Sequence, residues 1–205
     1  MTCYELAYLG VANRFHGEAA AAILSYCKAD AARGELLGLW AADVGDLNRI
    51  AVFRRYAAAE IQAAERRRLA ESTDPFGCGG WLMDWSLTAY GPFIDLPPIE
   101  TGKRGPFYEV RTYDLRIGGL EKLRAAWRDR LPGRAAISPL LTAMISLEGV
   151  PRFTHIWPYP SMDARTQARD KALAGGAWPP NAYPGQPPTR MRNFIFRPLP
   201  GSPLC

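Results

Sequence analysis

Two short segments carry side chains that could act together on a small molecule. One reads RFTHIWPY, and the alternation of a β-strand places His155, Trp157 and Tyr159 on the same face. The other reads YEVRTY and places Arg111 and Tyr113 on one face of a second strand. An imidazole, a guanidinium and several aromatic rings could bind a planar, anionic or phenolic compound. His155, with an ordinary pKa of about 6.5, could accept a proton from it.

The same residues also fit a purely structural role. His155 could be a half-buried strand histidine that is hydrogen-bonded to a neighbour, with Trp157 and Tyr159 as core or interface aromatics. Glu109 with Arg111, and Glu5 in the first copy, are most simply explained by ion pairing across strands. Two interpretations therefore stay open: a small-molecule enzyme, and a non-catalytic small-molecule-binding or scaffold protein.

Other chemistries find little support in the sequence. The four cysteines are far apart, show no metal-binding spacing and are expected to be reduced, and only two histidines are present. The sequence contains no GxSxG motif, no P-loop and no GxGxxG motif after a strand. We therefore predict no metal and no cofactor, with haem kept as a minor alternative.

Charge and hydropathy indicate whether the partner is a nucleic acid, a membrane or a small molecule. The net charge is +5, but the basic residues are spread along the chain and alternate with acidic ones, so nucleic-acid binding is not expected. No apolar run is long enough to span a membrane, and the first residues resemble a strand rather than a targeting peptide. We expect a cytoplasmic protein whose partner is a small molecule, and a homodimer or higher homo-oligomer stays open.

The elements that would position these side chains occur twice. Tyr4-Glu5-Leu6 matches Tyr108-Glu109-Val110 at a spacing of 104 residues, and the segment that starts at Arg49 matches the one that starts at Arg152 at a spacing of 103. Two distant matches at nearly the same spacing indicate an internal duplication.

Each copy is predicted to run strand, helix, strand, strand, helix, strand. In the second copy the hydrophobic spacing predicts strands over 108–113, 141–147, 152–157 and 191–196. A helix from 120 should end at Pro132-Gly133, Ser161 should cap the next helix, and a Pro-rich loop should cover 178–188. In the first copy, helices are predicted over 15–32 and 57–69 and a strand over 81–89.

A βαββαβ unit is the ferredoxin-like fold, in which both helices cover one face of an antiparallel sheet. The uncovered faces of two such copies can bury one another. We therefore predict an α+β fold of two tandem ferredoxin-like repeats that form an intramolecular dimeric α+β barrel. The expected division is a first repeat over 1–91, a linker over 92–106 and a second repeat over 107–205.

Several motifs resemble the NIPSNAP family. They are YEVRTYDL from Tyr108, HIWPY from His155 with the following Arg165 and Arg169, GDLNR from Gly45, and WPP from Trp178. The resemblance implies the dimeric α+β barrel and no settled activity. Related barrels include cofactor-independent monooxygenases that act on polyketide-like compounds, haem-degrading enzymes and chlorite dismutases, which is an analogy of fold.

The two copies differ where this pattern is strongest. HIWPY in the second copy is replaced by VFRRY in the first. If there is one pocket per chain, we expect it in the second half, lined by Arg111, Tyr113, Trp157 and Tyr159, with His155 as the catalytic residue. The resulting prediction is a cofactor-independent oxygenase or isomerase acting on an aromatic or polyketide-like compound.

Overall fold

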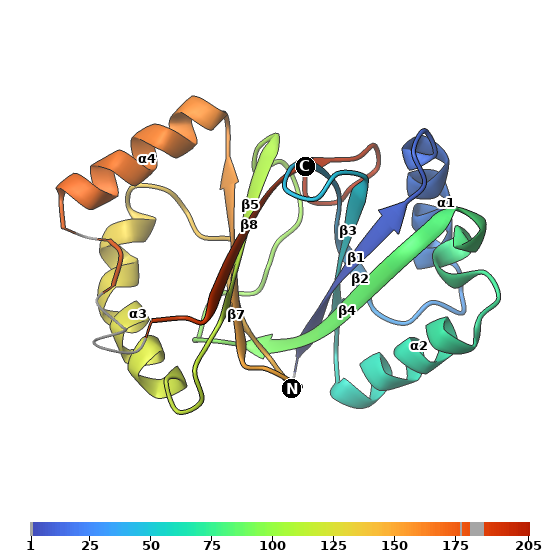
Figure 1. Ribbon diagram of the computed structural model, residues 1–205, viewed down its shortest axis with the longest axis horizontal. Coiled ribbons are helices and arrows are strands. Elements are labelled where there is room, and N and C mark those ends of the chain that lie inside the picture. Colours follow the sequence, from blue (N-terminus) through green and yellow to red (C-terminus); the bar gives the residue numbers. More distant parts are fainter. Residues whose placement is uncertain (1, 177, 181–186) are drawn as a thin grey trace. The chain divides into compact units, whose positions relative to one another are not determined.

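A computed structural model describes residues 2–176, 178–180 and 187–205 (Figure 1). The chain divides into two compact units. Unit 1 contains the residues through Gly91, together with Thr101–Lys103 and Phe196–Cys205, and unit 2 contains Pro92–Glu100 and Arg104–Ile195. The last ten residues of the chain thus belong with the first repeat.

Unit 1 follows the predicted order of elements. They are β1 (Cys3–Val11), α1 (His16–Lys28), β2 (Glu35–Val44), β3 (Arg49–Tyr56), α2 (Ala59–Glu71) and β4 (Leu82–Pro92). The strand β1 is antiparallel to both β3 and β4, and β2 is antiparallel to β3. The end of β8 lies beside β2, followed by a hydrogen bond from the Leu199 amide to the Leu39 carbonyl at 2.9 Å.

The core of unit 1 lies between its two helices and one face of its sheet. Alternate residues of β1 and β3 point toward the helices, and Leu9 and Val52 belong to the same buried cluster as Ile23 of α1 and Leu69 of α2. The two helices lie on the same side of these strands in Figure 1. Residues on the opposite face of the sheet, such as Phe53, are buried as well.

Unit 2 repeats the same order of elements. They are β5 (Phe107–Asp114), α3 (Leu120–Ala135), β6 (Thr142–Ser146), β7 (Arg152–Tyr159), α4 (Met162–Ala174) and β8 (Arg190–Pro198). The central strand β7 is antiparallel to β5 and β6, and β8 lies next to β5. Part of the predicted Pro-rich loop, 181–186, lies outside the described residues.

The start of α4 and the end of α3 were both predicted from the sequence. The Ser161 hydroxyl accepts a hydrogen bond from the Ala164 amide at 3.0 Å and caps α4, as predicted. The predicted end of α3 at Pro132-Gly133 is wrong, because the helix continues to Ala135. Pro132 lies in the last turn, where its missing N–H removes a single backbone hydrogen bond and does not stop the chain from continuing as a helix.

The hydrogen-bonded order of the eight strands is β1-β3-β2-β8-β5-β7-β6-β4, and this order closes on itself. Both units have the strand–helix–strand–strand–helix–strand order of a ferredoxin-like repeat. The predicted α+β barrel of two tandem repeats is therefore confirmed.

Candidate functional site

Unit 2 contains a pocket of about 380 Å³ on the helix-facing side of its sheet. All five residues proposed from the sequence line it: Arg111 and Tyr113 from β5, and His155, Trp157 and Tyr159 from β7. Further lining residues were not in that proposal, among them Glu109, Trp127, Arg134, Arg169 and Trp178. The pocket thus combines aromatic walls with several charged groups.

Strand register explains why these side chains meet. Arg111 of β5 lies directly opposite His155 of β7, and Glu109 lies opposite Trp157. Alternation along each strand turns every second side chain to the same face, so this set all points toward α3 and α4. A shift of one residue in this pairing would turn the whole set to the other face.

His155 is fully buried, with 1% of its surface exposed, rather than half-buried as the structural interpretation assumed. The indole Nε1 of Trp157 donates a hydrogen bond to His155 Nδ1 at 2.6 Å. The other ring nitrogen, Nε2, is buried and has no hydrogen-bond partner among the described residues. Burial holds the pKa of His155 well below its ordinary value, and the positive charges of Arg111, Arg134 and Arg169 lower it further. The imidazole is therefore neutral at physiological pH.

Three tryptophans form the aromatic wall. The ring centroid of Trp127, from α3, lies 5.0 Å from that of His155 and 4.7 Å from that of Trp178. Trp127 itself is almost completely buried, with 2% of its surface exposed. Trp157 lies 6.1 Å from Trp178 in an edge-on arrangement. Such a wall favours a flat apolar ligand, because aromatic pairs of this kind are rigid and bury a large area.

Arg134 enters the pocket from α3 and is 3% exposed. Its guanidinium carbon lies 4.3 Å from the ring centroid of Trp157, and its Nη2 donates a hydrogen bond to the Tyr159 hydroxyl at 3.1 Å. Burial raises the pKa of Tyr159, so its phenol stays protonated. Arg134 was not among the predicted pocket residues because the helix was expected to end at Pro132-Gly133, just before it.

Glu109 is ion-paired with a helix rather than across the sheet. Its Oε1 lies 2.5 Å from Nη2 of Arg165 and 3.7 Å from Nη1 of Arg169, both on α4. The expectation of a cross-strand ion pair for Glu109 is therefore wrong. Arg111 instead lies over the ring of Tyr113, with 5.5 Å between the guanidinium carbon and the ring centroid.

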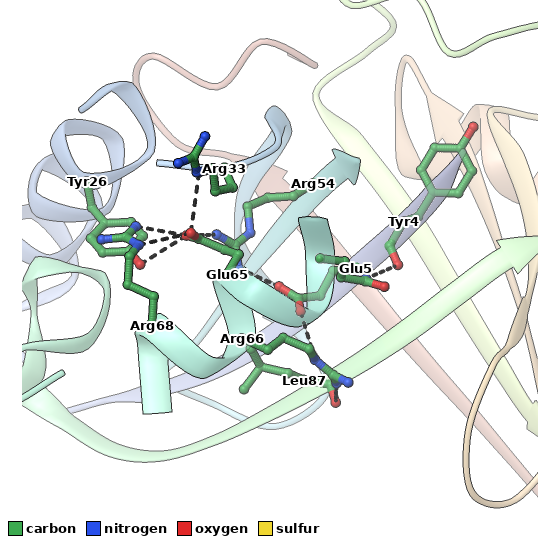
Figure 2. Close-up of polar contacts among 10 residues, drawn as sticks. Tyr4, Glu5, Tyr26, Arg33, Arg54, Glu65, Arg66, Arg68 and Leu87 are labelled. Atoms are coloured by element: carbon green, nitrogen blue, oxygen red, sulfur yellow. Dashed lines mark hydrogen bonds and ion pairs between the residues drawn. The ribbon is translucent and has the colours of Figure 1, made fainter. Parts of the chain in front are cut away.

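The corresponding position of unit 1 is filled by an ion cluster (Figure 2). Arg54 Nη2 lies 2.5 Å from Glu5 Oε1, and its Nη1 lies 3.1 Å from Glu65 Oε1. Both carboxylates are completely buried. A second guanidinium holds each of them, from Arg66 at 3.1 Å for Glu5 and from Arg68 at 2.9 Å for Glu65. Charged side chains thus occupy the space that is a pocket in unit 2.

The repeat spacing of 103–104 residues shows what changed between the copies. Glu5 corresponds to Glu109 and Arg66 to Arg169, so the pair between the first strand and the second helix exists in both units. The copies differ at many other positions, two of which concern the ion cluster: Arg54 corresponds to Trp157, and Glu65 corresponds to Ala168. Unit 2 therefore lacks the buried Arg–Glu pair that occupies this position in unit 1.

Metal sites and membrane spans can be assessed for residues 2–176, 178–180 and 187–205. In this part of the chain, no group of three or more His, Cys, Asp or Glu side chains is placed to hold a metal ion. No helix within it has the length and apolar composition to cross a membrane.

Comparison with known proteins agrees with the motifs. Residues 108–203 match the sequence model of the NIPSNAP family. The second half of the chain is a NIPSNAP domain. A NIPSNAP family protein of unknown function from Agrobacterium tumefaciens is 25% identical over 52% of this chain and all of that chain, with a TM-score of 0.44. No match is found among the curated proteins.

Solved structures resemble the chain over nearly its full length, beyond the NIPSNAP domain. A candidate monooxygenase from Lactobacillus acidophilus is 12% identical and has a TM-score of 0.66, with 95% of this chain and 92% of that chain covered. An anthrone oxidase-like protein is 14% identical and has a TM-score of 0.63, with 97% and 91% covered. At these identities the likeness shows the fold alone.

Proposed function

We propose that the pocket of the NIPSNAP domain binds an aromatic or polyketide-like compound, and that the protein acts on it as a cofactor-independent oxygenase or isomerase. The observation that carries this proposal is the pocket itself, with the buried His155, the buried Arg134 and the half-buried Arg111 inside an aromatic wall. A pocket of this size with a few convergent polar groups is typical of a small-molecule site. The names of the two full-length structural neighbours support the oxygenase class by analogy of fold.

The pocket favours one chemical step in particular. Positive charge near a bound phenol or enol lowers the pKa of that group, because it stabilises the anion more than the neutral form. The resulting phenolate or enolate is the electron-rich form that reacts with dioxygen, and it is also the form that an isomerase reprotonates at a different carbon. Arg111 and Arg134 would supply this charge, and the tryptophan wall would exclude water.

A non-catalytic binding protein is the second candidate, and one observation favours it. The described residues that line the pocket include no strong base: the pKa of His155 is lowered, and the Glu109 carboxylate is held by Arg165 and Arg169. A substrate would then have to lose its proton to water. A binding protein needs no such step.

A two-stage experiment separates these candidates. Purified protein would be screened against hydroxylated naphthalenes and anthrones by thermal shift and native mass spectrometry. Compounds that bind would then be incubated with protein and tested for dioxygen consumption and for isomerised product. His155→Phe should abolish binding or turnover, whereas His16→Phe in unit 1 should preserve both.

The outcomes are distinct. Binding with turnover supports the enzyme, and binding without turnover supports the binding protein. If no compound binds, or if His155→Phe behaves like His16→Phe, the proposed site is wrong.

A further inference from the structure

We infer that the pocket of unit 2 selects an oxyanion: a carboxylate, phenolate or enolate oxygen that is held between Arg111 and Arg134 and accepts a hydrogen bond from Nε2 of His155. This inference rests on the proposed function, because it specifies the charge of the ligand at that site. It also gives His155 a different role from the predicted one, as a hydrogen-bond donor instead of a proton acceptor.

The balance of charge in the pocket supports an anionic ligand. Glu109 is neutralised by Arg165 and Arg169 of α4. Arg111 and Arg134 have no carboxylate within 4 Å among the described residues. The remaining positions, 1, 177 and 181–186, contain no Asp or Glu that could supply one.

Arg134 is a buried cation without a counter-ion among the described residues. A guanidinium with 3% exposure normally has a carboxylate partner, since removing its charge from water is costly. Here its partners are the Tyr159 hydroxyl, the Ser138 carbonyl and the face of Trp157, none of which carries a negative charge. A bound oxyanion would supply the missing counter-charge.

The tautomer of His155 follows from its hydrogen bond with Trp157. An indole N–H can only donate, so Nδ1 of His155 must be the acceptor and carries no proton. In a neutral imidazole the proton then lies on Nε2. This N–H is buried without a partner among the described residues, and the His155 side chain lines the pocket. An unpartnered buried donor beside two arginines is suited to an anionic oxygen.

Matched probes test the charge requirement. We would measure the binding of 2-naphthoate and of its neutral isostere 2-naphthamide to the full chain at pH 7.5 by calorimetry. The carboxylate should bind at least about tenfold more tightly than the amide, because hydrogen bonds to charged groups are the stronger class. Equal affinities would overturn the inference and leave the proposed pocket standing. If neither probe binds, both the inference and the proposed function are wrong.

Variants assign the charge to individual residues. Arg111→Met and Arg134→Met should each weaken naphthoate binding by about ten- to a hundredfold and change naphthamide binding by less than about threefold. Arg152→Met is the matched control in the same unit, because Arg152 pairs with Asp114 and does not line the pocket. If Arg134→Met fails to fold, Arg111→Met alone carries this test. An equal loss for both probes would contradict the assignment.

Nitrogen NMR tests the histidine independently of any ligand. In protein labelled with ¹⁵N-histidine at pH 7.5, His155 should show an unprotonated Nδ1 and a protonated Nε2. Trp157→Phe should remove this preference, because it deletes the indole donor. A protonated Nδ1 in the wild-type chain would refute the donor role of His155.

Discussion

Replacing Arg54 by Met should destabilise unit 1 by about 3 kcal/mol. Arg54 lies between two carboxylates, and its side chain is 2% exposed while those of Glu5 and Glu65 are 0% exposed. Removing one partner of a buried ion pair costs about 3–5 kcal/mol, because it leaves the other charge uncompensated. Arg66 and Arg68 still hold one carboxylate each, which places the cost at the lower end of this range.

The effects of two substitutions in this cluster on the free energy of unfolding should not be additive. Glu65→Leu alone leaves Glu5 as the only carboxylate paired with Arg54 in the described part of the chain. Arg54→Met together with Glu65→Leu leaves the Glu5–Arg66 pair and an apolar neighbourhood, which is the arrangement found in unit 2. The double variant should therefore lose less stability than the sum of the two single variants, by about 1–3 kcal/mol.

Thiol labelling can measure this effect in unit 1 by itself. All four cysteines of the chain belong to unit 1, and Cys78 and Cys3 are each 2% exposed. In a background with the exposed Cys205 replaced by Ser, the rate at which Cys78 reacts with a thiol reagent in native buffer reports the opening of unit 1. Urea denaturation followed by circular dichroism gives the corresponding free energy of unfolding.

Arg55→Met provides the matched control on the same strand. Arg55 pairs with Glu35, but the two side chains are 26% and 51% exposed, and exposed pairs contribute at most about 1 kcal/mol. Arg54→Met should accelerate the labelling of Cys78 by about a hundredfold relative to this control. Similar labelling rates in the two variants, or additive effects of Arg54→Met and Glu65→Leu, would refute the role assigned to the cluster.

Two further predictions concern unit 2. Ser161→Ala should destabilise α4, which carries Arg165 and Arg169, by about 1 kcal/mol because the helix cap is lost. Ser161→Asp should keep the stability of the wild type, because Asp also caps helices. Thermal denaturation of the two variants checks both expectations. His155 has a lowered pKa in the folded state, so below about pH 6.5 the unfolded chain binds a proton that the folded chain does not. The free energy of unfolding should therefore fall as the pH drops from 6.5 toward the folded-state pKa, by up to about 1.4 kcal/mol per pH unit. Urea denaturation at pH 7, 6 and 5 measures this free energy. Its dependence on pH should be weaker in His155→Phe than in His16→Phe.

Much of the fold could be predicted because it repeats. The match between the segments that begin at Tyr4 and Tyr108 fixed the register of the two copies, and alternation then placed the β5 and β7 side chains on a common face. Ser161 could be recognised as a cap from its residue type and position. The end of α3 was mispredicted because Pro132 was treated as a stop, and a proline in the last turn of a helix is not one.

The contents of the pocket could be predicted only in part. Strand periodicity identifies side chains on one face of a sheet, so it found Arg111 and His155. It cannot show which side of a helix faces that sheet when the helix is rich in charge, so Arg169 was not predicted to line the pocket. The state of His155 depends on burial and on a hydrogen bond from Trp157, two residues along the same strand face. Neither follows from residue type alone.

The two units have the same order of elements but different side chains in the space between the sheet and the helices. Both retain a glutamate on the first strand that is held by an arginine of the second helix, so this pair belongs to the shared architecture. In unit 1 the remaining space holds Arg54, which is compensated by Glu65. In unit 2 Trp157 and Ala168 stand at those positions, and the buried positive charge is supplied instead by Arg134 of α3, which has no carboxylate partner among the described residues. Arg54 is a buried cation whose counter-ions are supplied by the protein. Arg134 is a buried cation without such a counter-ion, and an anionic ligand could supply it. This difference, more than the fold, is the reason for assigning the ligand to the second unit.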